Sequence, residues 1–135
     1  MRLLIIGASG ATGRHLVDQA LQAGHIVTAF VRDPARLPLT HAALRVVAGD
    51  AMRRESLGPV VDGHDAVVCI LGAKPEGVDA PRGQPGVPVC SAGTRHLIEA
   101  MTSAGVRRLV VVSSASVGDS RATGPDWSTS SQLRL

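Results

Sequence analysis

Residues 3–13, with the sequence LLIIGASGATG, decide the fold that we expect for this chain. The first four are an unbroken apolar run, which is typical of a strand buried on both faces of a sheet. Three glycines follow, and beyond them apolar residues recur at helical spacing from Leu16 to Leu21 until Gly24 ends the helix. Strand, glycine turn and helix in this order predict an anion-binding site at the start of the helix.

Each glycine in the turn has a predicted role. Gly7 lets the chain leave the strand tightly, Gly10 lets a pyrophosphate approach bare backbone, and Gly13 lets helix and strand pack closely. A mononucleotide P-loop needs a lysine and then Ser or Thr after its last glycine, whereas Arg14 and His15 stand here. The spacing G-x-x-G-x-x-G therefore predicts a dinucleotide site, and a glycine turn that binds nothing is the weaker alternative.

Length and composition indicate one soluble α/β domain. The chain has 135 residues, enough for a single core, and Phe30 and Trp127 are its only large aromatic residues, so we expect an aliphatic core. No apolar run approaches the roughly 18 residues of a membrane span. Arg2 leads directly into the first strand. We therefore expect a cytoplasmic protein with no signal peptide and no membrane partner.

Charge, cysteines and histidines exclude several other classes. The net charge is +3, but it comes from scattered arginines with Lys74 as the one lysine, so we expect no nucleic-acid partner. Cys69 and Cys90 lack metal-ligand spacing and are expected to be reduced thiols, with Cys69 filling the core. The five histidines show no ligand spacing either, so we expect no metal.

Further apolar runs alternate with helical patterns along the chain. They predict four more strands, at 25–31, 44–48, 65–71 and 109–112, and helices at 35–39, 56–61 and 89–104. Ser56 is expected to cap the middle helix, with Pro59 in its first turn. The alternation predicts an α/β fold, a Rossmann-like doubly wound parallel sheet of five strands in the order 3-2-1-4-5.

The polar residues at the strand ends suggest how a dinucleotide would be read. Arg32 is the first polar side chain after the second strand, where an arginine pairs with the 2′-phosphate of NADP, so we expect NADP (NADPH) in preference to NAD. A solvated loop arginine is the alternative, Asp33 would instead favour NAD, and Arg36 is a second candidate partner for the phosphate. Asp50 is expected either to contact adenine or to form a turn.

The fourth strand ends in Gly72 and Ala73, two small residues that would let the ribose and nicotinamide approach closely. Residues 74–88 are rich in proline and glycine and predict an irregular loop, either a substrate lid or a plain connection. We expect a dinucleotide-binding domain over 1–118 and a poorly ordered polar tail over 119–135.

These motifs together resemble the NmrA-like, NAD(P)H-binding branch of the atypical short-chain dehydrogenase/reductases, and within it the biliverdin reductase B/flavin reductase group. The resemblance spans roughly residues 2–118 and is carried by GASGATGRHL, VRDPARL, AGDA, DAVVCILGA and AGVRRLVVVSSASVG. It implies that the glycine turn wraps the pyrophosphate and that Ser113 and Ser114 lie beside the nicotinamide, Ser114 matching the reductase serine. The cofactor-binding residues that it and the strand ends imply are Gly7, Ser9, Gly10, Ala11, Thr12, Gly13, Arg32, Asp50, Ala51, Leu71, Gly72, Ala73 and Ser113.

Two departures from the family separate the functional hypotheses. The chain has no tyrosine, so the Tyr-x-x-x-Lys acid/base pair of many short-chain dehydrogenases is excluded for it. The part of the family fold beyond the fifth strand is expected to be missing, which would expose a sheet edge suited to self-association. The leading hypothesis is an NADPH-dependent reductase that transfers hydride to a small planar acceptor, such as a flavin, tetrapyrrole or quinone. The alternatives are a non-catalytic NAD(P)-binding sensor of NmrA type or an inactive truncated reductase; an epimerase or hydroxy-compound dehydrogenase is weaker.

Overall fold

The computed structural model describes residues 1–72 and 89–112 and contains one parallel sheet in the order β3-β2-β1-β4-β5. This confirms the predicted architecture. The strands are β1 (Arg2–Ile6), β2 (Ile26–Val31), β3 (Leu44–Ala48), β4 (Ala66–Cys69) and β5 (Leu109–Val111). The helices are α1 (Ala11–Gln22), α2 (Arg54–Val61) and α3 (Val89–Ala104), with a 3-10 turn, η1 (Pro34–Arg36), after β2.

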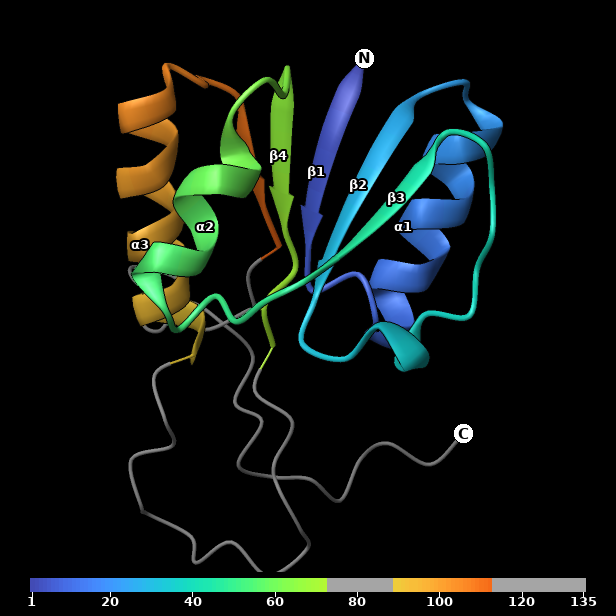
Figure 1. Cartoon of the computed structure of the whole chain (residues 1–135), viewed down its shortest axis with the longest axis horizontal. Helices are drawn as coiled ribbons and strands as arrows, with labels where there is room; N and C mark the ends of the chain where they lie inside the picture. Colours follow the sequence, from blue (N-terminus) through green and yellow to red (C-terminus); the bar gives the residue numbers. More distant parts are fainter. Residues whose placement is uncertain (73–88, 113–135) are drawn as a thin grey trace, which may run out of the picture.

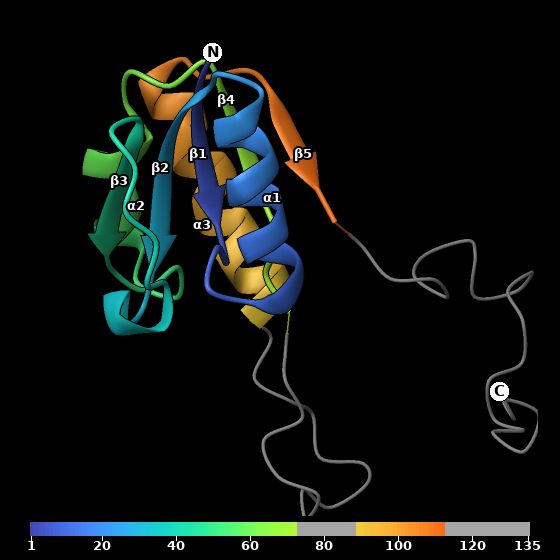
Figure 2. The ribbon, with the colours of Figure 1, turned by 90° about the vertical axis from the view of Figure 1, so that its right-hand side faces the viewer.

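The sheet lies between two helical layers, with α1 on one face and α2 and α3 on the other (Figures 1 and 2). Successive residues of β1 point to opposite faces, so Leu4 and Ile6 join the core beneath α2 and α3, whereas Ile5 joins the core beneath α1. All three side chains are buried. Burying one such side chain stabilises the fold by roughly 1.5–3 kcal/mol, which explains why the apolar run takes the middle of the sheet.

β1 is central because it pairs with strands on both of its sides. Ile5 lies opposite Ala29 of β2 and Val68 of β4 in the parallel register. The strand order therefore reverses between β1 and β4: β2 and β3 extend the sheet to one side of β1, and β4 and β5 extend it to the other. The carboxyl ends on either side of such a reversal are where doubly wound sheets bind ligands.

Helix α2 begins earlier than the sequence pattern predicted. Its N-cap is Arg53, so Ser56 lies inside the first turn and Pro59 lies inside the helix, which corrects the predicted Ser56 cap. The cause is a turn built by Asp50, whose side-chain Oδ1 accepts a hydrogen bond from the Met52 N–H at 2.9 Å. The Asp50 carbonyl also accepts from the Arg53 N–H at 2.9 Å, and the chain enters the helix at the next residue. The predicted helix at 35–39 is instead the shorter η1.

One buried polar pair joins the sheet to the loop after α2. Thr28 of β2 is buried, and its hydroxyl lies 2.9 Å from Nε2 of His64. Nδ1 of His64 lies 3.2 Å from the carbonyl oxygen of Val61. A ring that donates through Nδ1 and accepts at Nε2 satisfies all three groups, so the hydroxyl is buried at little cost.

β5 forms one edge of the sheet, and its apolar side chains are exposed, Val110 at 57% of its surface and Val111 at 45%. Self-association through this edge remains a prediction. The expected loop at 74–88 and the expected tail at 119–135 lie outside the described residues. Among the described helices, none is long and apolar enough to cross a membrane.

Candidate functional site

Because the strands are parallel, their carboxyl ends lie along one edge of the sheet, the lower edge in Figure 1. This edge carries the glycine turn after β1, Arg32 after β2, Asp50 after β3 and Leu71 after β4. Residues that are far apart in the sequence therefore lie along one edge, on both sides of the point where the strand order reverses. The arrangement is the one that the sequence predicted for a dinucleotide site.

The glycine turn is held by contacts that only bare backbone can make. Gly7 has φ +86°, and a Cβ atom placed on it would overlap the carbonyl oxygen of Ile70 at the end of β4. A Cβ on Gly13 would overlap the Gly7 carbonyl oxygen and lie 2.8 Å from Cα of Ala8. The Gly10 N–H closes the turn by donating to the Gly7 carbonyl at 3.1 Å. These contacts confirm the predicted roles of Gly7 and Gly13.

The start of α1 lacks a side-chain cap and a negative charge. Gly10 is the N-cap, no side chain caps the helix, and no acidic residue stands in its first turn. Gly10, Ala11 and Thr12 are exposed, and the first N–H groups of a helix have no acceptor within the helix itself. A Cβ on Gly10 would meet only the Gly7 carbonyl oxygen, at 3.4 Å, so glycine here keeps open space beside these donors. The residues fit an anionic diphosphate.

Arg14 joins the glycine turn to the loop after β2. Its Nε donates to the carbonyl oxygen of Ser9 at 3.2 Å, and its Nη2 donates to the carbonyl oxygen of Arg36 at 2.6 Å. The planar guanidinium can serve two acceptors at once, which a lysine ammonium on its flexible stem does less well. Arg14 therefore fixes the turn that would hold the pyrophosphate relative to the loop that would hold the adenosine ribose.

Arg32 and Asp33, the first two charged residues after β2, make different contacts. Asp33 caps η1, because its Oδ1 accepts a hydrogen bond from the Ala35 N–H at 3.0 Å. Arg32 is exposed and lines an open hollow of about 370 Å³ together with Gly49, Asp50, Arg53 and Ser56. One oxygen of Asp33 is thus committed to a turn, while the Arg32 side chain faces the hollow.

The hollow lies between the ends of β2 and β3 and the start of α2. Gly49 forms part of its lining and packs on the Phe30 ring so closely that a Cβ would overlap that ring. Asp50 uses one oxygen in the turn before α2, which confirms the turn interpretation and leaves its second oxygen for a ligand.

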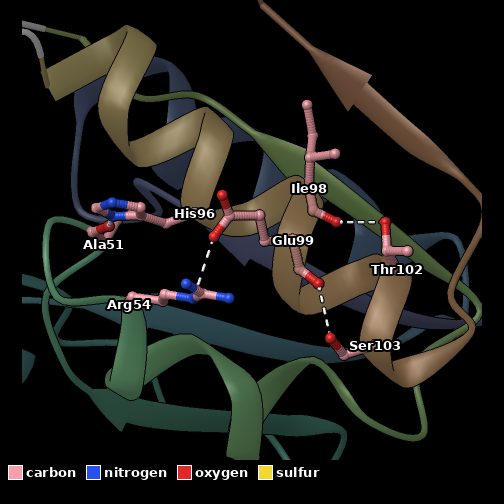
Figure 3. Close-up of polar contacts among 7 residues, drawn as sticks. All are labelled: Ala51, Arg54, His96, Ile98, Glu99, Thr102 and Ser103. Atoms are coloured by element: carbon pink, nitrogen blue, oxygen red, sulfur yellow. Dashed lines mark hydrogen bonds and ion pairs between the residues drawn. The ribbon is translucent and has the colours of Figure 1, made fainter.

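Helix α3 packs against the residues that follow β3 and β4 at this edge. Nδ1 of His96 lies 3.2 Å from the carbonyl oxygen of Ala51, and Arg54 of α2 forms an ion pair with Glu99 at 3.1 Å (Figure 3). A Cβ on Gly93 would lie 2.6 Å from Cδ1 of Leu71. One face of α3 therefore contacts both the end of β3 and the end of β4.

The end of β4 is tied to the start of α3 by a thiol. Cys90 is exposed, and its Sγ lies 3.2 Å from the carbonyl oxygen of Leu71. Cys69 is buried in the core, as predicted, with its Sγ 3.7 Å from the Thr94 hydroxyl. Gly72 is exposed, and no atom of residues 1–72 or 89–112 lies within 4 Å of the position that a Cβ would take. This open backbone is where a ribose was expected.

Three residues of the predicted site, Ala73, Ser113 and Ser114, lie outside the described residues. Across the two described ranges there is no group of three or more His, Cys, Asp or Glu side chains that could hold a metal ion. The described residues at this edge offer groups that can bind an anionic ligand. These are helix N–H groups, bare glycine backbone and arginine side chains.

The sequence matches a known protein family and several curated proteins. The model of a family described as NAD(P)H-binding matches residues 7–135. A 3-beta-hydroxysteroid dehydrogenase of Mycolicibacterium neoaurum is 35% identical over 122 residues, which are 86% of this chain and 32% of that protein. A 3-diazoavenalumate denitrifying reductase of a Streptomyces species is 36% identical over 128 residues, 85% of this chain and 38% of that protein.

A third relative is the photosystem II assembly factor Ycf39 of Synechocystis, 31% identical over 114 residues, 84% of this chain and 33% of that protein. The chain thus spans about a third of the length of the curated relatives that it matches. Among solved structures, an oxidoreductase from Lactococcus lactis superposes with a TM-score of 0.75 at 20% identity, over 95% of this chain and 55% of that one. That likeness supports the fold.

The sequence did not predict the roles of Arg14 and His96. Arg14 was used only to exclude a P-loop, and His96 only lacked metal spacing. Each donates to a backbone carbonyl, Arg14 to Arg36 and His96 to Ala51, and such acceptors leave no mark in a residue pattern. Gly93 carried a weak signal, since the helical spacing already placed it on the face that α3 buries.

We expect Arg14→Lys to loosen the loop after β2, because a lysine cannot hold both the Ser9 and Arg36 carbonyls in the same geometry. The free energy of unfolding should fall by about 1–2 kcal/mol, and amide hydrogen exchange at Leu37, whose N–H donates to Pro34, should accelerate. The control is Arg45→Lys on exposed β3. Equal exchange at Leu37 in both variants would contradict the bridging role.

Proposed function

We propose, from the premise that the chain belongs to the NAD(P)H-binding family, that it binds NADPH across the carboxyl edge of its sheet. We further propose that the whole protein is an NADPH-dependent reductase. The observation that carries the proposal is the uncapped start of α1 beside bare glycine backbone, at the point where the strand order reverses. That geometry suits a pyrophosphate.

The preference for NADPH is supported by how the residues after β2 are used. Arg32 faces the hollow, whereas Asp33 already accepts a hydrogen bond from the Ala35 N–H. In this class of fold an acidic side chain here would accept from the ribose hydroxyls of NAD, and an arginine would pair with the 2′-phosphate of NADP. An arginine with no partner among the described residues, beside an aspartate that already accepts a hydrogen bond, therefore favours the phosphorylated cofactor.

The described residues would bind and orient the dinucleotide. The N–H groups at the start of α1 would hold the pyrophosphate, Asp50 and Ala51 would border the adenine, and Leu71 and Gly72 would border the second ribose. Bound NADPH supplies a hydride. What this chain supplies is position, because a hydride passes efficiently only between closely held, aligned partners.

The acceptor that we propose is a small planar molecule of the flavin, tetrapyrrole or quinone type. The resemblance to the biliverdin reductase B/flavin reductase group supports this choice, and hydride transfer to a flat acceptor requires mainly that the two partners are held close and aligned. Ser114 is the proposed donor to the acceptor and Ser113 the proposed neighbour of the nicotinamide.

The alternative is an NAD(P)-binding protein without catalysis, in which the dinucleotide is a structural or regulatory ligand. The relative from Synechocystis supports it, because that protein is named as an assembly factor rather than as an enzyme. Both functions need the same cofactor site. They differ in whether bound NADPH is consumed.

Replacing Arg32 tests the proposed cofactor. Arg32→Gln should weaken NADPH binding tenfold or more, which corresponds to a charge-assisted contact of about 1.5–3 kcal/mol, and should leave NADH binding unchanged. A titration that follows nicotinamide fluorescence measures both, and Arg45→Gln on β3 is the matched control. Equal loss for both cofactors would contradict a 2′-phosphate contact.

Consumption of NADPH separates the two functions. We expect oxidation of NADPH, followed at the nicotinamide absorbance, when FMN or a benzoquinone is added to the chain. The Arg32→Gln variant should oxidise NADPH more slowly at low NADPH concentration. Its rate should return to that of wild type as the NADPH concentration is raised, because the defect lies in binding. Tight NADPH binding with no consumption above the protein-free rate for any acceptor would favour the non-catalytic alternative.

A further inference from the structure

A second arginine faces the hollow that Arg32 lines. Arg53 is the N-cap residue of α2, lies after the Gly49–Asp50 turn, lines the hollow and is exposed. Within residues 1–72 and 89–112, neither guanidinium has an ion-pair or hydrogen-bond partner. Two arginines without counterions, brought to one hollow by different elements, indicate a site for an anion rather than a structural ion-pair network.

The other groups around the hollow leave it electropositive. Asp50 is the one carboxylate of its lining and keeps its negative charge, so the lining carries two positive charges against one negative charge. Ser56 adds a hydroxyl donor. The start of α2 borders the hollow, and the positive end of the helix dipole adds to the positive potential there. Glu55 in the first turn of α2 reduces this contribution.

The shape also suits a bound group. Gly49 packs directly on the Phe30 ring, so part of the lining is bare backbone, and any side chain at this position would overlap the ring. The hollow, of about 370 Å³, is wide open to solvent, so it suits a charged group that stays partly hydrated rather than an enclosed ligand. The arginine and serine side chains border the hollow.

The adjacent arginine is used differently. Arg54 does not line the hollow; it pairs with Glu99 of α3 at 3.1 Å (Figure 3). Two consecutive arginines thus differ in their contacts: Arg54 joins α2 to α3, whereas Arg53 lines the hollow.

We propose that Arg53 is a second specificity-determining residue, which together with Arg32 grips the phosphate monoester on the adenosine ribose of NADPH. This inference rests on the proposed function. It adds that the phosphate is held from two sides, by the end of β2 and by the start of α2, so that the cofactor preference depends on both elements.

The test compares the NADPH and NADH dissociation constants of wild type, Arg53→Gln, Arg53→Lys and Arg54→Gln. Arg53→Gln should reduce the preference for NADPH roughly fivefold to twentyfold and leave NADH binding unchanged. Arg53→Lys should keep most of the preference, because it keeps the charge. Arg54→Gln should keep all of it, and 2′,5′-ADP should compete with NADPH less well in Arg53→Gln than in wild type.

Two results would overturn the role of Arg53: an unchanged preference in Arg53→Gln, or equal weakening of both cofactors. A wild-type chain without any NADPH preference would contradict the proposed cofactor as well. A wild-type preference that Arg32→Gln removes and Arg53→Gln does not would contradict the role of Arg53 alone. Thermal melting of each variant checks that folding is intact, which we expect because both arginines are exposed.

Discussion

The close approach of three backbone segments at Gly7 and Gly13 is the constraint on which the candidate site depends. Gly13 brings the first turn of α1 against Gly7, and Gly7 in turn packs on the Ile70 carbonyl at the end of β4. Any side chain at either glycine would push these segments apart. Because they are in contact, the start of α1 lies beside the carboxyl ends of β1 and β4, the neighbouring strands between which the strand order reverses.

Helix α3 extends this constraint along the edge. It meets Leu71 through Gly93 and Cys90, and it meets the Ala51 carbonyl through His96. The proposed adenine border and the proposed border of the second ribose therefore share one rigid support. A site for a long ligand needs its two ends at a fixed separation, and a single packed helix provides that more reliably than two independent loops.

The strand order and the roles of Gly7 and Gly13 could be predicted from the sequence, because buried parallel strands read as apolar runs and a tight turn demands glycine. The start of α2 could not. Ser56 has the better intrinsic preference for a cap, yet the Asp50 turn begins the helix at Arg53. A local hydrogen bond here outweighs propensity, and that shift of register also brings Arg53 to the hollow.

Contacts between residues far apart in the chain could not be predicted from the sequence pattern either. The Arg14 guanidinium finds the Arg36 carbonyl 22 positions away, and nothing in either residue type identifies the other. Arg53 and Arg54 are indistinguishable in sequence, and only the position of Glu99 on α3 assigns one of them to an ion pair. The residue pattern therefore predicted the backbone positions of the candidate site but not the partners of its arginine side chains.

The most direct test of the account is to map NADPH on the 135-residue chain by amide chemical shifts in solution. We expect saturating NADPH to shift the amide signals of residues 7–13, Arg32, Asp50 and Leu71, and to leave those of β5 and of the solvent face of α3 unchanged. Shifts confined to other surfaces, or no saturable shift at all, would contradict the claim that this sheet edge is a dinucleotide site.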